Sequence, residues 1–245
     1  MLAPLPLLSV ILPVKAPNYL VLRRCMASFA ALDQASCVQI VVVYTGHLDF
    51  LQIGEYPEFH SVHLKHCEAA GIYSAFNAGI EMAEGSFLLF FGHDDVALPE
   101  MDEVLFVLSK SCGGRVVVAA GVYVQGIGVR RATRLRQAVA LRNWPHQGMF
   151  YSACLFDDQK YDISFPLRAD HCLNISFLAD RSIRCVRPQQ VVSYFSRGGF
   201  STRVVEDKEF DANQADITAK AFGWFWGGVV RYLLPFVRQM RKFVR

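Results

Sequence analysis

The chain has 245 residues, a formal net charge of +3 and 53% apolar residues, with a mean hydropathy of +0.24. This length allows one large domain or two small ones with a sizeable core, and so small a charge does not indicate a nucleic-acid-binding protein. The seven scattered cysteines form no CxxC pair, which argues against a disulfide framework or structural zinc site and favours reduced thiols in a cytosol.

The first half of the chain alternates short apolar runs with one-sided helical patterns. Leu7–Val14 is the first expected strand, and it lacks the basic flank of a signal peptide. Neither a GxGxxG nor a GxxxxGK[ST] pattern follows it, which disfavours a dinucleotide-binding Rossmann site and a P-loop. Further strands are expected at Gln39–Val43, Ser61–Leu64 and Phe87–Phe91. Helices are expected between and after the strands. One has Leu22, Met26 and Phe29 on its apolar face, the second has apolar residues from Ile72 to Ala83 and ends at Gly85, and the third has apolar residues from Met101 to Leu108. This order predicts an α/β fold with a mostly parallel central sheet flanked by helices.

Two adjacent carboxylates follow the most apolar of these strands, in the stretch SFLLFFGHDDVALPE. The strand places Asp94 and Asp95 at its carboxyl end, where open α/β sheets bind ligands. Neighbouring carboxylates repel each other unless a cation or hydroxyl donors lie between them. The pair therefore predicts a metal or sugar site, although a helix N-terminal cap before Pro99 explains it in part.

The second half of the chain is less regular. Arg115–Gln125 and Gly128–Ala132 alternate like a hairpin, an arginine-rich stretch runs from Arg130 to Arg142, and His146 and Gln147 precede a short strand at Met149–Tyr151. A helix is expected over Ala169–Leu178, followed by strands at Ile183–Val186 and Val191–Phe195. No linker separates the halves, so we expect them to share one sheet. The arginines are expected to form a solvated face, or to bind an anionic acceptor or lipid.

The C-terminal segment, FGWFWGGVVRYLLPFVRQMRKFVR, has an amphipathic helical pattern. Arg231, Pro235 and Arg238 interrupt it too often for a membrane span. An interfacial helix on an anionic membrane surface is favoured, over a helix packed on the protein's own core. We therefore expect one domain over residues 1–210 and an amphipathic, membrane-associated helix over residues 211–245. One helical face carries Phe222, Phe225, Trp226, Val229, Leu233, Phe236, Val237, Met240 and Val244.

Five stretches in order resemble the bacterial family 2 glycosyltransferases, which have a GT-A fold and use nucleotide-sugar donors. They are SVILPV, GIYSAFNAGIEMAEGSFLLFFGHDD, WPHQGMFYSACLF, YDISFPLRADHCLNISFL and VVSYFSRGGFST, within residues 7–203. The resemblance implies a metal-dependent, inverting transfer of sugar to a glycan or lipid-linked glycan, in synthesis of bacterial surface polysaccharide or lipopolysaccharide. It also implies a cytoplasmic protein that is peripheral at the inner face of the bacterial inner membrane.

The resemblance also assigns roles to individual residues. Asp95 is the expected ligand of Mg²⁺ or Mn²⁺, and Asp170 is the expected catalytic base. Donor-binding residues are Pro13, Tyr44, Tyr73, Asn77 and Asp94, and residues on the acceptor or diphosphate side are His146, Gln147 and Gly199.

Three positions differ from the family pattern. Tyr44 and Thr45 stand where the family carries acidic residues, and Ser74 replaces an aspartate. These differences leave the nucleobase open and motivate an alternative, a catalytically degenerate member that acts as a membrane-associated scaffold or partner. A nucleotidyltransferase is a third option, but Lys15-Ala16-Pro17-Asn18 does not supply the Gly-rich loop that such enzymes usually carry after the first strand.

Overall fold

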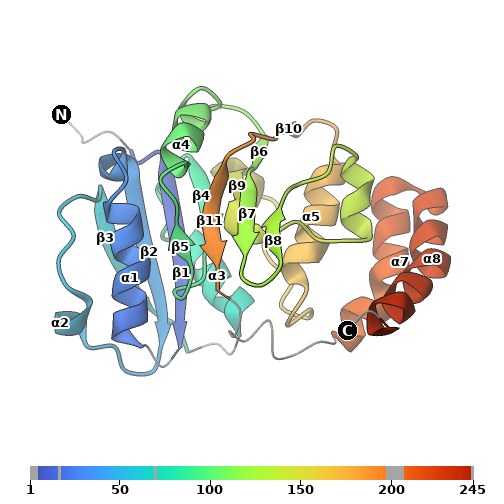
Figure 1. Ribbon diagram of the computed structural model, residues 1–245, viewed down its shortest axis with the longest axis horizontal. Coiled ribbons are helices and arrows are strands. Elements are labelled where there is room, and N and C mark those ends of the chain that lie inside the picture. The colour runs from blue at the N-terminus through green and yellow to red at the C-terminus, as the bar shows by residue number, and fades with distance from the viewer. Residues whose placement is uncertain (1–4, 16–17, 69–70, 197–206, 244–245) are drawn as a thin grey trace.

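A seven-stranded sheet lies at the centre of the fold, with the strand order β10-β6-β9-β4-β1-β2-β3 (Figure 1). The computed structural model describes residues 5–15, 18–68, 71–196 and 207–243. Neighbouring strands run parallel, except that β9 is antiparallel to both β4 and β6. The mostly parallel sheet is therefore confirmed. Its strands are β1 (Leu8–Lys15), β2 (Val38–Thr45), β3 (Ser61–His66), β4 (Phe87–Phe90), β6 (Val116–Ala119), β9 (Met149–Ser152) and β10 (Arg184–Val186).

A second, four-stranded sheet has the order β5-β11-β7-β8. The expectation that both halves of the chain share one sheet is wrong for these strands. Backbone bonds from Ala120 to Gly148 O (2.8 Å) and from Gly121 to Gln190 O (2.8 Å) mark where the chain crosses from β6 into the second sheet. The predicted hairpin forms between β7 and β8. The strands are β5 (Val96–Ala97), β7 (Gly121–Val124), β8 (Gly128–Arg130) and β11 (Val191–Phe195).

Helices cover both faces of the central sheet. Val10 and Leu12 of β1 pack with α1 and α4, whereas Ile11 packs with α3 and α5, because successive strand residues point to opposite faces. Such strands are buried on both sides, which is why they read as continuous apolar runs. The helices are α1 (Tyr19–Ala30), α2 (Phe50–Ile53), α3 (Ile72–Ile80), α4 (Met101–Ser109), α5 (Ala169–Ala179), α7 (Lys208–Phe222) and α8 (Trp224–Phe243); the short 3-10 turns are η1 (Ala35–Cys37), η2 (Arg136–Ala140), η3 (His146–Gly148) and η4 (Ala153–Phe156).

Gly85 does not end α3, as the sequence suggested, because the helix already ends at Ile80. A Cβ at Gly85 would lie 2.6 Å from the backbone nitrogen of Ser9. The glycine is needed where the chain passes close to β1 before entering β4.

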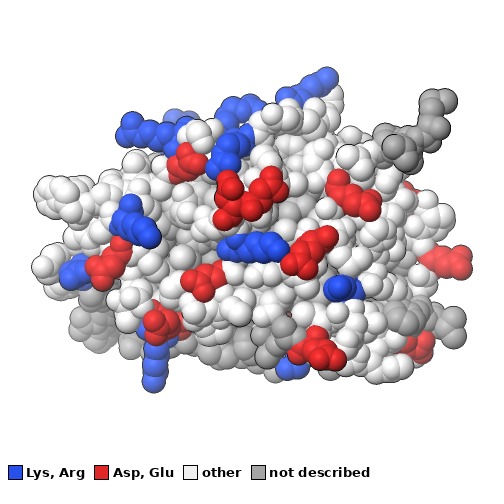
Figure 2. All heavy atoms as spheres, turned by 180° about the vertical axis from the view of Figure 1, so that it is seen from behind, with Lys and Arg blue, Asp and Glu red and all other residues white. Residues whose placement is uncertain are grey.

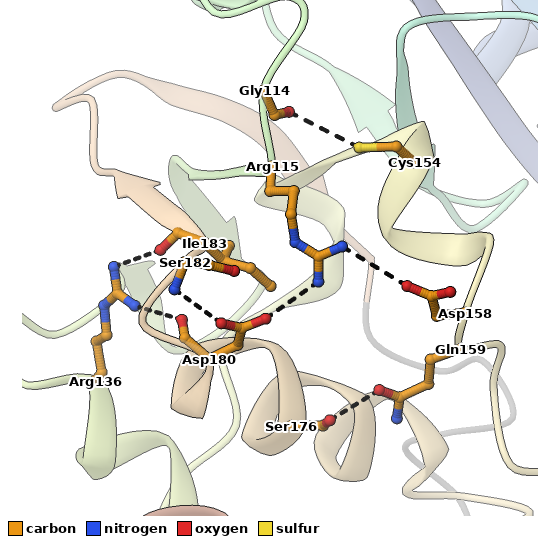
Figure 3. A network of polar contacts seen from close by, with 10 residues as sticks. All are labelled: Gly114, Arg115, Arg136, Cys154, Asp158, Gln159, Ser176, Asp180, Ser182 and Ile183. Carbon is orange, nitrogen blue, oxygen red and sulfur yellow. Dashed lines mark hydrogen bonds and ion pairs between the residues drawn. The ribbon is translucent and has the colours of Figure 1, made fainter.

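The end of α5 is fastened by two arginines (Figure 3). Arg115 Nη2 lies 3.1 Å from Asp180 Oδ2, and Arg136 donates to the carbonyls of Asp180 (3.1 Å) and Ile183 (2.7 Å). Arg131 likewise donates to the carbonyl of Gln189. Arg131 and Arg136, within the arginine-rich stretch, thus hold backbone carbonyls, a role that sequence analysis did not anticipate.

Two C-terminal helices stand where the sequence predicted one. Gly223, with φ of 92°, separates α7 from α8, and the two helices pack side by side next to α5 (Figure 1). The predicted boundary after residue 210 falls inside α7, where Phe210 packs in the core at 5.8 Å between ring centroids from Phe165. Asp207 caps α7 by accepting from the backbone nitrogen of Phe210 at 3.1 Å.

The apolar residues of α8 divide between two faces. Val230 and Leu234 are buried against Ala140, whereas Trp224 is 85% exposed and Tyr232 is 75% exposed. Phe225 and Phe236 also face outward, so this part of the apolar stripe is not packed on the protein's own core. Within the described ranges, no helix has the length and apolar character needed to cross a membrane.

Acidic and basic side chains are interspersed on the face seen from behind (Figure 2). Neither sign of charge forms one continuous surface among the described residues drawn there. This distribution agrees with the small net charge and offers no extended basic track on that face for a nucleic acid.

Candidate active site

The candidate site lies at the carboxyl ends of β1, β2 and β4, and the acidic pair follows β4 where the sequence predicted it. Pro13 of β1 pairs with Val43, one residue before Tyr44. His93, in the loop after β4, lies with Nδ1 3.2 Å from the carbonyl oxygen of Pro13. The loop that carries the acidic pair therefore packs against the end of β1.

Both carboxylates of the acidic pair turn toward the space above Gly92. A Cβ at Gly92 would lie 2.7 Å from Asp95 Oδ2 and 2.8 Å from Asp94 Oδ1. The Asp95 nitrogen donates to Gly92 O at 3.1 Å, which closes a turn. Successive side chains of an extended segment would point to opposite sides, but this segment turns, so the two carboxylates converge.

Asp95 is completely buried. Its Oδ1 accepts from the Ser196 backbone nitrogen at 3.0 Å, and its Oδ2 accepts from Gln147 Nε2 at 3.2 Å. Burial, with a further contribution from the Asp94 charge, raises the pKa of Asp95 to about 7. Two hydrogen bonds do not fully offset the cost of a buried charge, so the ionised pair favours a cation nearby.

The donor atoms here fit Mg²⁺ or Mn²⁺. Among the residues that the structure describes, no three His, Cys, Asp or Glu side chains form a complete ligand set. Mg²⁺ is commonly held by one or two carboxylates together with substrate phosphates and water. Two converging carboxylates meet that requirement, with Asp95 the buried member and Asp94 beside it.

A second polar centre surrounds Asp170, in the first turn of α5. Its Oδ1 accepts from Tyr73 Oη at 2.8 Å, its Oδ2 accepts from Asn143 Nδ2 at 2.7 Å, and His146 Nδ1 lies 3.6 Å from Oδ2. Burial raises the pKa of Asp170, but hydrogen bonding and charge from His146 and the Tyr73 hydroxyl outweigh burial and lower it. The carboxyl is therefore ionised at neutral pH.

Asn143 is itself held by a buried chain of side chains. Asn174 Nδ2 donates to Asn143 Oδ1 at 2.9 Å, and Tyr151 Oη donates to Asn174 Oδ1 at 2.7 Å. Asn174 and Tyr151 are completely buried. Sequence analysis missed all three residues, and their only sequence signal is that Asn143 precedes the WPHQ stretch and Asn174 follows Asp170 by one helical turn.

Two predicted donor contacts have other partners in the structure. Tyr73 points its hydroxyl at Asp170, so it belongs to the second polar centre. Asn77 bonds the Tyr161 backbone through both ends of its amide, at 2.9 and 3.0 Å. Asn77 therefore holds the segment around Tyr161 against α3.

The remaining predicted residues flank the site. The ring of Tyr44 packs against His66 with centroids 5.2 Å apart, at the β2–β3 end of the carboxyl edge. Gln147 reaches Asp95, and His146 reaches Asp170, so the two-residue segment joins both polar centres. Gly199 lies outside the described residues.

The family model described as glycosyl transferase family 2 matches residues 9–169. The chain belongs to glycosyl transferase family 2. The match begins in β1 and ends one residue before Asp170, so the acidic pair and the His146-Gln147 segment lie inside it. This confirms the family and the GT-A fold that the five stretches indicated.

Curated relatives and solved structures agree with this membership. The chain is 33% identical over 156 residues to the PGL/p-HBAD biosynthesis glycosyltransferases of Mycobacterium tuberculosis and Mycobacterium bovis, covering 57% of this chain and 56% of each relative. The chain thus spans little more than half of their length. The Staphylococcus aureus TarS structure superposes with a TM-score of 0.61 at 17% identity, covering 88% of this chain and 44% of TarS. A 1–349 TarS fragment in complex with UDP-GlcNAc superposes at 0.60 and 18% identity, covering 92% and 73%. At such low identity, these superpositions show the fold.

Proposed function

We propose that the chain transfers a sugar from a nucleotide-sugar donor to a glycan or lipid-linked glycan acceptor, with Mg²⁺ or Mn²⁺ and inversion at the anomeric carbon. The observation that carries this proposal is the joining of two polar centres by one segment, since Gln147 bonds Asp95 while His146 faces Asp170. One centre suits a charged diphosphate with its cation, and the other suits removal of a proton from a hydroxyl. The names of the mycobacterial relatives and the UDP-GlcNAc bound to TarS support a donor of this class.

In this proposal, the two polar centres have separate roles in the reaction. Asp94 and Asp95 hold the donor diphosphate through the cation, which neutralises charge on the leaving group when bound. Asp170 is the carboxylate of the acid–base centre, fixed by Tyr73 and Asn143. The acceptor hydroxyl loses its proton at this centre as its oxygen attacks the sugar from the side opposite the diphosphate.

Hydrolysis of nucleotide sugars by the purified protein tests the proposal. We expect Mn²⁺-dependent release of nucleoside diphosphate that is lost on chelation and in Asp95→Ala. A folded protein that binds no nucleotide sugar, with or without Mn²⁺, contradicts it. Such a protein would instead fit a non-catalytic scaffold, the role that Tyr44, Thr45 and Ser74 motivated.

We also propose that α8 rests on the anionic inner face of a bacterial membrane, where acceptors for surface polysaccharide or lipopolysaccharide synthesis are handled. Exposed Trp224, Phe225, Tyr232 and Phe236 support this placement, because aromatic side chains favour the headgroup region and apolar area drives interfacial binding. The described side chains Val230 and Leu234 keep the helix attached to the protein.

Sedimentation with phosphatidylglycerol-containing vesicles tests the membrane proposal. Replacing Phe225 and Phe236 together by serine is expected to weaken binding at least tenfold, since burying each side chain contributes roughly 1.5–3 kcal/mol. Phe106→Ser, at an exposed position on α4, is the matched control and is expected to bind as wild type. Equal binding by all three proteins would contradict the role of α8.

A further inference from the structure

Helix α1 lies beside the loop that carries the acidic pair and packs against β5 at the end of that loop (Figure 1). Arg24 Nη2 donates to the carbonyl oxygen of Asp94 at 2.8 Å, and the backbone nitrogen of Ala97 donates to Ser28 Oγ at 2.9 Å. Arg24 and Ser28 are four residues apart, so their side chains leave the same face of the helix. One face of α1 therefore holds the middle and the end of the loop.

The peptide unit that joins Asp94 to Asp95 is held at both of its polar ends. Its oxygen accepts from Arg24, and its nitrogen, which belongs to Asp95, donates to Gly92 O at 3.1 Å. Cys25 Sγ also lies 3.6 Å from Gly92 O, so α1 contacts this acceptor too. Because a peptide unit is planar, holding its oxygen and its nitrogen restricts the directions of both flanking side chains. These two side chains are the converging carboxylates.

Arg24 also brings a positive charge to the acidic pair. Burial raises the pKa of the Cys25 thiol well above its usual range, the charges of Asp95 and Asp94 raise it further, and the charge of Arg24 lowers it. All three charges therefore act on one buried group beneath the loop. Two converging carboxylates repel each other, and a cationic side chain held beside them reduces that repulsion in the metal-free protein.

We propose that Arg24 is a positioning residue of the donor site, which holds the peptide unit between Asp94 and Asp95 so that both carboxylates face the cation and diphosphate of the donor. Arg24 acts through the two acids and does not itself contact the donor in this role. Replacing a residue that orients metal ligands changes metal affinity by roughly 10–100-fold. The proposal rests on the proposed glycosyl transfer, whereas the placement of the loop is a property of the free protein.

Hydrogen exchange of the metal-free protein tests the placement of the loop without a donor. In chelator, Arg24→Gln is expected to speed amide exchange in residues 92–97 by roughly tenfold, because the peptide unit between the two acids loses one of its two hydrogen bonds. Arg23→Gln is the matched control. It removes the same charge from the neighbouring position of α1, where Arg23 Nε bonds the carbonyl of Gln52. This control is expected to exchange as wild type in residues 92–97.

Titration calorimetry with UDP as the probe tests the consequence for the donor site. With Mn²⁺ present, Arg24→Gln is expected to weaken UDP binding by roughly 10–100-fold, and Arg23→Gln is expected to bind as wild type. Arg24→Lys is expected to recover most of the loss, since lysine keeps the charge and can donate to the same carbonyl. In chelator, Arg24→Gln and wild type are expected to bind UDP equally.

Two results overturn the proposal. Unchanged exchange in residues 92–97 of Arg24→Gln shows that Arg24 does not position the loop. Weaker UDP binding by Arg24→Gln in chelator shows that the guanidinium contacts the diphosphate directly. If wild type binds no UDP with Mn²⁺ while Arg24→Gln still exchanges faster, the proposed function fails and the placement of the loop by Arg24 is supported. Arg24 is exposed, and circular dichroism of each variant confirms that the fold is retained.

Discussion

Replacing Asp95 by asparagine is expected to stabilise the metal-free protein at pH 8. Asp95 is completely buried, and its pKa is raised from 3.8 to about 7, first by burial and then by the Asp94 charge. The folded state therefore favours the protonated carboxyl. The protonated Asp95 carboxyl contributes to the stability of the folded protein, and this contribution is fully present below about pH 4 and is lost as pH rises through about 7. Asparagine has nearly the same shape and carries no charge at any pH.

The size of the effect follows from the pKa. A rise from 3.8 to about 7 corresponds to a ceiling of roughly 4 kcal/mol of destabilisation at pH 8, because each pH unit is worth about 1.4 kcal/mol. Rearrangement around the new amide reduces the gain, so we expect Asp95→Asn to exceed wild type by roughly 1–3 kcal/mol. For a chain of this size, each kcal/mol raises the melting temperature by roughly 2–4 °C.

Thermal melts in chelator at pH 5 and pH 8 provide the assay. The advantage of Asp95→Asn is expected to be large at pH 8 and much smaller at pH 5. Adding Mn²⁺ and UDP is expected to raise the melting temperature of wild type and leave that of the variant unchanged. This result would show that the carboxylate that lowers the stability of the metal-free protein is also the one needed for binding. An Asp95→Asn protein less stable than wild type at pH 8 in chelator refutes the reasoning, since it would show that ionised Asp95 is not a cost.

Three further substitutions test individual contacts of the site. Asn143→Ala removes a hydrogen-bond donor to Asp170 Oδ2, so the pKa of Asp170 is expected to rise. The rate of nucleotide-sugar hydrolysis is expected to fall at least tenfold, and an unchanged rate would show that this bond is dispensable. Gly92→Ala places a methyl group within 2.8 Å of both carboxylates. Calorimetry is expected to show that UDP binding in the presence of Mn²⁺ is weakened at least tenfold, whereas binding as tight as in wild type would show that the carboxylates need not converge. Asn77→Ala frees the Tyr161 backbone, and urea unfolding is expected to show a loss of roughly 1–3 kcal/mol; full stability would mean that water replaces the amide.

Much of the fold follows from local patterns in the sequence. Continuous apolar runs marked β1, β2 and β4 because these strands are buried on both faces. The acidic pair was predicted at the carboxyl end of β4 because it directly follows one of these apolar runs. Asp170 and the His146-Gln147 segment came from the family resemblance.

The rest depends on contacts between distant segments. Asn143, Tyr151 and Asn174 are joined by side-chain bonds across 31 and 23 residues, and no local pattern reveals such partners. The convergence of Asp94 and Asp95 depends on a turn that the Asp95 backbone nitrogen closes on Gly92 O, and the residues after β4 carry no sequence signal for that turn. Helix α7 was not distinguished from α8 because its largely polar sequence carries no strong apolar stripe. Its few buried residues, such as Phe210 and Gln214, contact partners from other elements.

Donor binding tests the central claim most directly. Isothermal titration of UDP-glucose, UDP-GlcNAc, UDP-galactose and GDP-mannose into the purified chain, with Mn²⁺ and with chelator, measures whether the acidic pair holds a nucleotide diphosphate. We predict that at least one of these donors binds with Mn²⁺, and that its binding falls at least tenfold in chelator and in Asp95→Ala. Donor binding of equal strength in chelator and in Asp95→Ala, or no binding of any donor by a folded protein, would contradict the account.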